Sequence, residues 1–213
     1  MRQSDRLPAY QTALDTLWQR GLLYPCTCTR RDIAAAASAP QEGTAPPFGP
    51  DGLIYPGTCR LAHARTGPLP QNTALRLDMQ AAAQSLSFLE TGSGPNGQTG
   101  EIENSTDDLI RNVGDIVLSR CDFSGSYHLS VVLDDAAQNI THVIRGQDLF
   151  EATKIHVLLQ ALLNLPTPIY HHHRLIRDDT GKRLAKRDDA RAITKYRHDS
   201  TTLADIRALL NLP

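Results

Sequence analysis

The chain has 213 residues with 22 basic and 23 acidic side chains, and its net charge of −1 excludes an overall basic field for nucleic acid. A hydrophobic content of 40% and a charged content of 21% indicate one globular domain, or one domain with a small insert. Four cysteines are too few for a disulfide scaffold, and no apolar run approaches the roughly 20 residues of a membrane span. We therefore expect a cytoplasmic protein.

The first half of the chain is predicted to combine short elements with loops. Apolar residues at helical spacing predict a helix over residues 8–20, and residues 22–28 are typical of a short strand or turn. A helical turn is expected within 32–37, and residues 73–78 alternate as in a strand. Residues 38–52 and 92–100 contain Pro and Gly without periodicity, which predicts flexible surface loops.

The second half is predicted to alternate strands and helices. Strands are expected at 115–120, 128–133, 140–145 and 171–176. An amphipathic helix is expected at 148–163, and helical pieces at 193–196 and 203–210. This β-α-β order favours one half of a nucleotide-binding α/β sheet.

A cysteine cluster near the start is a candidate metal site. Cys26 and Cys28 are one residue apart, so both thiols face the same way on an extended segment, and Cys59 is a third sulfur. Zinc prefers four tetrahedral ligands, and simple ligand chemistry favours His63 as the fourth. The alternative is three unrelated buried thiols. Cys121 lies beside an apolar strand and is expected to be a buried structural thiol.

A basic run over residues 179–188 is the most informative feature of the chain. Lys182, Arg183 and Lys186 crowd positive charge into a short span, and Gly181 supplies backbone freedom. The run predicts a mobile cationic loop that could bind a triphosphate. The alternative is a solvated basic loop without a ligand.

This run resembles the second signature loop of class I aminoacyl-tRNA synthetases, usually Lys-Met/Leu-Ser-Lys. Arg183 stands for the first lysine, Ala185 for the serine and Lys186 for the second lysine. Residues 127–135 followed by 141–146 are similar to the glutamate-binding half of glutamyl-tRNA synthetases.

Residues 26–28 and 55–60 look like the zinc site of a smaller relative, the glutamyl-Q tRNA(Asp) synthetases. The resemblance implies an α/β fold: the C-terminal portion of a class I synthetase Rossmann-type catalytic domain with a zinc-binding acceptor-type insert. It divides the chain into a helix ending the first Rossmann half, the zinc-containing insert, the second Rossmann half, and the signature loop with the C-terminal helices. These parts are residues 1–21, 22–110, 111–180 and 181–213.

The resemblance also implies site residues. It makes Tyr55 the fourth ligand of one structural Zn²⁺, where ligand chemistry alone favours His63. It implies Mg²⁺ with ATP and a structural zinc held by four protein ligands. The implied residues are Cys26, Cys28, Tyr55 and Cys59 for zinc; Tyr127 and Arg145 for glutamate; Lys186 and His172 for ATP; and Lys186, Arg183 and Lys182 for catalysis.

Each of these sites has a structural alternative. Arg145 could be a strand-end arginine paired with Asp148 or Glu151. Asp134 and Asp135 are interpreted as a strand-to-turn boundary rather than an acid site. The run of three histidines from 171 to 173 cannot turn all its rings to one face of a strand, which argues against a three-histidine metal site.

The function implied is ATP-dependent activation of L-glutamate and transfer of the glutamyl group to the queuosine base of tRNA(Asp). The alternatives are a fragment of a glutamyl-tRNA synthetase that charges a tRNA 3′ end, and a non-catalytic zinc-stapled RNA-binding module. The other class I signature, His-x-Gly-His, is absent from the sequence, since no histidine has glycine two residues later. We therefore expect weak or no activity from this chain alone, with a separate chain as one possible source of the missing half.

Overall fold

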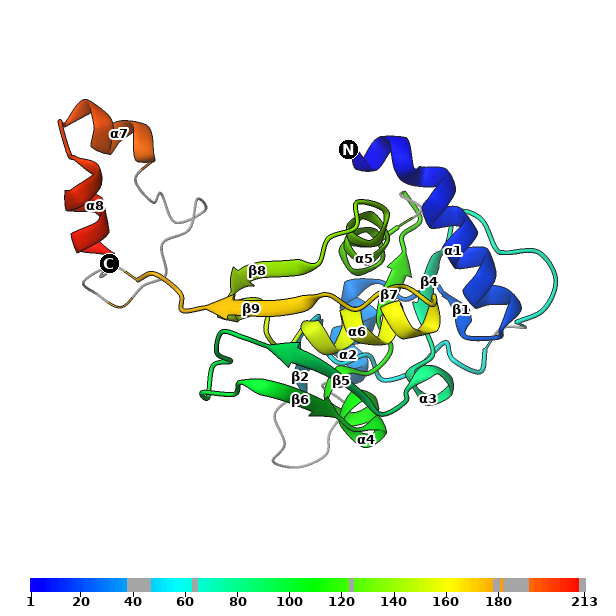
Figure 1. The fold of residues 1–213 in the computed structure, drawn as a ribbon. Helices are drawn as coiled ribbons and strands as arrows, with labels where there is room; N and C mark the ends of the chain where they lie inside the picture. The colour runs from blue at the N-terminus through cyan, green and yellow to red at the C-terminus, as the bar shows by residue number, and fades with distance from the viewer. Residues whose placement is uncertain (38–46, 63–64, 123–124, 178–180, 182–191, 211–213) are drawn as a thin grey trace. The chain divides into compact units, whose positions relative to one another are not determined.

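The computed structural model describes residues 1–37, 47–62, 65–122, 125–177, 181 and 192–210 (Figure 1). The chain forms two compact units, Met1–His173 and Arg174–Pro213. None of the described helices has the length and apolar character needed to cross a membrane.

The helices of the first unit include both long amphipathic helices and single turns. Helix α1 begins with a proline in its first turn, which suits the fixed φ of that residue. It buries one face through Tyr10, Leu14, Leu17 and Trp18. The helices are η1 (Gln3–Arg6), α1 (Leu7–Gln19), α2 (Arg30–Ala37), α3 (Met79–Ala82), α4 (Thr106–Asp108), the π-helical turn η2 (Leu109–Val113), α5 (Tyr127–Ala137), η3 (Gln147–Leu149) and α6 (Thr153–Leu162).

The described residues of the first unit also form three sheets. One is antiparallel, in the order β1-β4-β7, and comprises Leu23–Cys26, Ala74–Leu77 and Val117–Ser119. A second pairs β2 (Phe48–Gly49) with β3 (Gly52–Leu53). The third has the order β6-β5-β9-β8, from Gly100–Asn104, Leu86–Glu90, Ile169–His173 and His142–Gly146. Strand β9 is parallel to both β5 and β8, whereas β5 and β6 are antiparallel.

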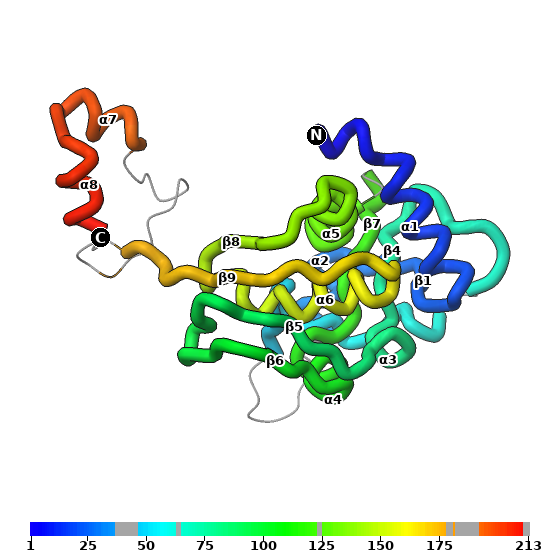
Figure 2. The backbone as a smooth tube through the Cα atoms, viewed as in Figure 1, coloured from blue at the N-terminus to red at the C-terminus, as the bar shows by residue number. Residues whose placement is uncertain are grey.

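The main core lies between the helices and the antiparallel sheet. Helix α5 packs against α1 and α6, and α6 also packs against β5 (Figures 1 and 2). The core joins buried residues of α1, β1, β4, β7, α5 and α6. A smaller cluster of Phe88, Phe150, Val157 and Tyr170 holds α6 on the mixed sheet. The mixed sheet and its helix together position the strand ends at 145 and 172.

The second unit contains α7 (Ile193–His198) and α8 (Leu203–Leu209). Thr202 caps α8 by accepting a hydrogen bond from the Asp205 backbone N–H, and the Asp205 side chain accepts from the Thr202 N–H in return. Both helices lie where apolar spacing predicted helical pieces.

Several predicted elements are confirmed and others are wrong. The helix at 8–20 and the strands at 73–78, 115–120 and 140–145 are confirmed as α1, β4, β7 and β8, with ends shifted by a few residues. The strand predicted at 128–133 is wrong, because these residues lie inside helix α5. The loop predicted at 38–52 is wrong at its end, where β2 and β3 form a short hairpin, and residues 38–46 lie outside the described part.

Candidate functional site

The cysteine cluster is assembled from the end of β1 and the segment after β3. Cys26 closes β1, and Cys59 follows a turn in which Gly57 adopts a φ of 83°. The three sulfurs of Cys26, Cys28 and Cys59 lie within 4.8 Å of one another. The Tyr55 hydroxyl lies 3.5 Å from the Cys26 sulfur and 3.3 Å from the Cys28 sulfur. Three sulfur donors and one phenolic oxygen therefore converge, which is the ligand number and donor type that suit zinc.

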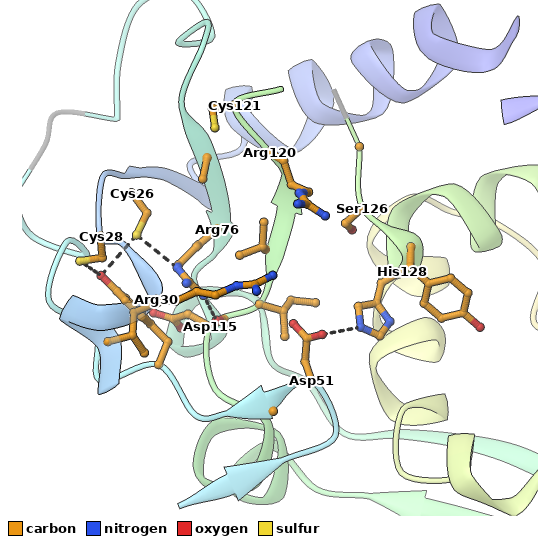
Figure 3. A pocket seen from close by; sticks show the side chains of 18 of the residues that line it. Cys26, Cys28, Arg30, Asp51, Arg76, Asp115, Arg120, Cys121, Ser126 and His128 are labelled. Atoms are coloured by element: carbon orange, nitrogen blue, oxygen red, sulfur yellow. Dashed lines mark hydrogen bonds and ion pairs between the residues drawn. The ribbon is translucent and has the colours of Figure 1, made fainter. Parts of the chain in front are cut away.

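A cation stabilises this cluster. The Arg76 Nε donates to the Cys26 sulfur at 3.3 Å, and the guanidinium lies 3.9 Å from the centre of the Tyr55 ring (Figure 3). Burial opposes ionisation of Cys59, but hydrogen bonds from Tyr55 and from the Thr27 backbone lower the pKa of its thiol to about 6. These contacts favour the thiolate form of Cys59, the form that binds metal. The hydrogen bond from Tyr55 lowers the pKa of the Cys28 thiol, but burial and the neighbouring sulfurs outweigh it and raise that pKa, and burial raises the pKa of the Tyr55 hydroxyl. His63, the other candidate for the fourth ligand, lies outside the described residues.

Sequence reasoning missed the residues that anchor the Cys59 segment. The buried Asp115 carboxylate accepts from Arg60 Nε at 2.8 Å, from the Tyr24 hydroxyl at 2.6 Å and from the Met79 backbone N–H at 2.8 Å. Because Arg60 directly follows Cys59, this carboxylate ties the third thiol to the antiparallel sheet. No sequence motif distinguishes Asp115, since its partners are 36 to 91 residues away.

Arg145 lies near the end of β8, as predicted. Its Nε donates to His172 Nε2 at 3.0 Å, and its Nη1 lies 3.1 Å from His156 Nδ1. Its Nη2 donates to Thr153 Oγ1 at 2.7 Å and to the Leu149 carbonyl at 3.4 Å. Glu151 pairs with Lys154 at 2.8 Å and not with Arg145, so this part of the structural alternative is not observed. All four hydrogen-bond partners are uncharged when the histidines are neutral.

Burial lowers the pKa of the Arg145 guanidinium, and its interactions with Tyr170, Tyr127 and Asp135 oppose that shift. Hydrogen bonding to Tyr127 is among these opposing causes, so the structure brings the two predicted glutamate contacts together. Tyr127 is the first residue of α5 and its side chain is 51% exposed. Ser126 caps this helix by accepting from the Leu129 N–H, which fixes where Tyr127 emerges.

Two histidines and a carboxylate extend the network. His156 Nε2 lies 3.0 Å from His128 Nδ1, and His128 Nε2 lies 3.3 Å from Asp51 Oδ1. Burial, reinforced by the Arg145 charge, lowers the pKa of His156 to about 2. His156 is therefore neutral at physiological pH and can accept from Arg145. The sequence signal for His128 and His156 was only that each sits in an otherwise apolar run.

The remaining predicted residues fall in different surroundings. His172 is 1% exposed and contacts Arg145 and Glu90, while His171 is half-buried and His173 is exposed. The three rings therefore do not share one environment, as expected for a strand. Lys182, Arg183 and Lys186 lie outside the described residues.

Two further expectations are corrected. Asp134 and Asp135 are not at a strand boundary but within α5. Asp134 nevertheless has the structural role that was favoured over an acid site, since it accepts from the Tyr10 hydroxyl at 2.7 Å and from Arg6 Nε at 3.1 Å. Cys121 is exposed rather than buried, because it lies just beyond the end of β7.

A cavity of about 1040 Å³ joins the cysteine cluster to the Tyr127 side of the site (Figure 3). Its lining includes Arg30 and Arg120 as well as Asp51 and His128, so it is polar and carries both signs of charge. It is large enough for a nucleoside-sized group.

Comparison with known proteins assigns the chain to a family. The model of the catalytic domain of class I tRNA synthetases (E and Q) matches residues 91–211. A glutamyl-Q tRNA(Asp) synthetase from Rhodobacter capsulatus is 62% identical over the whole chain, which spans 75% of that protein. Proteins of the same name from Albidiferax ferrireducens and Geobacter sulfurreducens are 41% and 37% identical, and the chain spans 63% and 56% of their lengths.

Solved structures support the fold. A glutamate tRNA ligase from Elizabethkingia meningosepticum, in complex with its amino acid, superposes with a TM-score of 0.63 at 23% identity, over 88% of this chain and 36% of that one. A glutamate-tRNA synthetase from Elizabethkingia anophelis gives a TM-score of 0.64 at 22% identity. The family match and the 62% identical relative establish the assignment. The chain belongs to the class I tRNA synthetase family of ligases for glutamate and glutamine, in the branch of the glutamyl-Q tRNA(Asp) synthetases.

Proposed function

We propose that the chain takes part in ATP-dependent activation of glutamate and in transfer of the glutamyl group to the queuosine base of tRNA(Asp). The observation that carries this proposal is the Arg145 guanidinium, which is held by four uncharged partners and has no ion-paired carboxylate among the described residues. A partly buried cation of this kind favours an anionic ligand, and the γ-carboxylate of glutamate supplies one.

The hydrogen bonds that Arg145 makes within the protein limit how it can bind glutamate. Arginine has five N–H donors, and four of those on Arg145 are directed at protein groups. The guanidinium therefore does not offer two free N–H groups as a fork for one carboxylate. Tyr127 also hydrogen-bonds to Arg145. We propose that the γ-carboxylate takes the place of this contact and binds the remaining N–H together with the Tyr127 hydroxyl, so that two residues share the recognition.

The proposed reaction has two steps. An oxygen of the glutamate α-carboxylate attacks the α-phosphorus of ATP, the bond to pyrophosphate breaks, and glutamyl-adenylate forms. A hydroxyl of the queuosine base then attacks the activated carbonyl carbon and AMP leaves. We propose that Lys186, with Arg183 and Lys182, stabilises charge on the departing pyrophosphate, which Mg²⁺ accompanies. That His172 contacts the adenine of ATP stays a prediction. Because the His172 side chain is buried between Glu90 and Arg145, its surroundings favour a role in supporting Arg145.

Zinc is proposed to be structural. Cys26, Cys28, Cys59 and Tyr55 would hold the ion with four protein ligands, which leaves no open position for activating water. Bound there, the ion would fix the loop after β3 against β1. The convergence of the four donor atoms, with Arg76 beside them, supports this proposal.

Glutamate affinity of Arg145 variants tests the proposal. In Arg145→Ala we expect the dissociation constant for glutamate to rise about 10- to 100-fold, because a hydrogen-bonded charge is lost. The measurement is calorimetric titration with glutamate, with glutamine as the control ligand. Arg111→Ala is the matched control variant, since Arg111 is exposed in a surface pair with Asp107. Equal affinities of wild type and Arg145→Ala for glutamate would contradict the proposal.

The acceptor is tested separately. We expect glutamate transfer to tRNA(Asp) that contains queuosine and none to the same tRNA without it. Transfer to a tRNA 3′ end would favour the second candidate, which the likeness to glutamate tRNA ligase structures supports. Binding of tRNA without use of ATP or glutamate would favour a zinc-stapled RNA-binding module.

A further inference from the structure

A buried carboxylate lies two hydrogen bonds away from Arg145. Glu90 ends strand β5 and is 1% exposed. Its Oε2 lies 2.5 Å from His172 Nδ1, and its Oε1 accepts from the backbone N–H groups of His172 at 2.8 Å and Gly92 at 2.7 Å. His172 Nε2 in turn accepts from Arg145 Nε at 3.0 Å. Hydrogen bonds therefore connect the buried Glu90 anion, through the His172 imidazole, to the Arg145 cation.

The chemistry of the three groups fixes the direction of each hydrogen bond. Arginine can only donate, so His172 Nε2 must be an acceptor and must carry no proton. His172 Nδ1 then carries the proton and donates it to Glu90. Burial opposes ionisation of Glu90, but the hydrogen bonds from His172 and Gly92 lower the pKa of its carboxyl, so the carboxylate is an acceptor as this order requires.

We propose that Glu90 and His172 are positioning residues for Arg145. They fix the plane of the guanidinium and hold His172 in the tautomer that accepts from Arg145. The inference rests on the proposed function, since it concerns the residue that would bind the glutamate carboxylate. In this role both residues act through Arg145 and not by direct contact with the glutamate carboxylate.

The imidazole between the two charges explains why a buried carboxylate does not compete with the ligand. A carboxylate in direct contact with Arg145 would occupy the donors that the substrate needs. Separated by His172, Glu90 still favours the charged guanidinium through the hydrogen-bonded chain. His156 holds the opposite side of the guanidinium in the same way, as a neutral acceptor 3.1 Å from Nη1. The side toward Tyr127 remains for the ligand.

The variant Glu90→Gln tests this inference most directly. The glutamine oxygen can keep the two backbone hydrogen bonds, but its amide nitrogen then donates toward His172 Nδ1. His172 must respond by carrying its proton on Nε2, which places two donors face to face at Arg145. We expect the ¹⁵N NMR signals of the His172 ring to report a change from the Nδ1–H to the Nε2–H tautomer. We also expect the dissociation constant for glutamate to rise about tenfold or more.

A second variant covers the case in which Glu90→Gln does not fold. In His172→Asn the side-chain amide can still donate to Glu90, but it is too short to reach Arg145. Glutamate affinity should therefore fall about tenfold in a folded protein. Glu103→Gln, on the exposed edge of neighbouring strand β6, is the matched control and should leave both readouts unchanged.

The outcomes separate this inference from the proposed function. Loss of glutamate affinity in Arg145→Ala, with wild-type affinity in both Glu90→Gln and His172→Asn, overturns the inference and leaves the proposed function intact. An unchanged His172 tautomer in folded Glu90→Gln also overturns the inference. A wild-type chain that does not bind glutamate overturns both. Loss of affinity in all three variants, with the tautomer change in Glu90→Gln, supports the inference.

Discussion

At the scale of single residues, the buried His156 makes the stability of this protein depend on pH. His156 has a folded-state pKa of about 2, against about 6.5 in an unfolded chain. Between these values the unfolded chain binds the proton and the folded chain does not, so stability falls as the pH drops below about 6.5. Protonation would also place an N–H against the Arg145 donor.

This gives a testable pH dependence. From pH 7 to pH 5 the unfolding free energy of the wild type should fall by up to about 1.4 kcal/mol per pH unit more than that of His156→Gln. Urea unfolding at several pH values measures the two slopes. His142→Gln, at an exposed position, serves as the control and should follow the wild type. Parallel curves for wild type and His156→Gln would refute the assignment of this pH response to His156.

Site residues could be predicted from the sequence where they belong to a recognisable motif. The cysteine cluster and Arg145 at its strand end came from spacing and resemblance, and the structure brings the three thiols together near Tyr55 and Arg145 together with Tyr127. Glu90, Asp115 and His156 could not be found in this way, because their roles depend on partners brought from distant segments. Cys121 was misjudged because a position beside an apolar strand does not establish burial.

At the scale of elements, the main wrong prediction from the sequence concerns α5. The run from 128 to 133 is apolar and contains two valines, which are typical of strands. Short apolar runs do not separate a buried strand from a buried helix by periodicity alone. Ser126 as N-cap and packing of α5 between α1 and α6 decide in favour of the helix. By contrast, the apolar pattern alone was enough to predict β8 and α7.

Two residues remain candidates for the fourth zinc ligand, Tyr55 in the segment between β3 and Cys59, and His63 four residues after Cys59. Tyr55→Phe removes the phenolic oxygen and keeps the ring under Arg76. If Tyr55 is the ligand, we expect zinc affinity to fall at least about tenfold, because one of four donors is lost. Competition with a chromophoric chelator measures this affinity. Normal affinity in Tyr55→Phe with reduced affinity in His63→Ala would reassign the ligand to His63.

At the scale of the whole molecule, zinc is expected to contribute to the stability of the first unit. The four donors join β1 to a loop whose other end is tied to the antiparallel sheet through Asp115. Chelation should lower the unfolding free energy by about 2–3 kcal/mol when zinc was present at 100 times its dissociation constant. Cys59→Ser should reproduce this loss in the presence of zinc.

Cys121→Ser is the matched control for that measurement. Cys121 lines the same cavity but lies outside the three-sulfur cluster, so its loss should change neither zinc content nor unfolding temperature. Metal analysis should give about one zinc per chain in the wild type and in Cys121→Ser. A folded wild-type chain without zinc after purification in zinc-containing buffer would contradict the structural metal site.

The pairing of β5 with β9 also determines when the fold can be completed during synthesis. Glu90 and His172 are 82 residues apart in the chain. At about 5–20 residues per second, a ribosome needs roughly 4–16 seconds to add the residues between them. During that interval Glu90 has neither its imidazole partner nor strand β9, although β6 is already available. A nascent chain should therefore keep this carboxylate in water, and the mixed sheet should close only after the histidine run has left the exit tunnel.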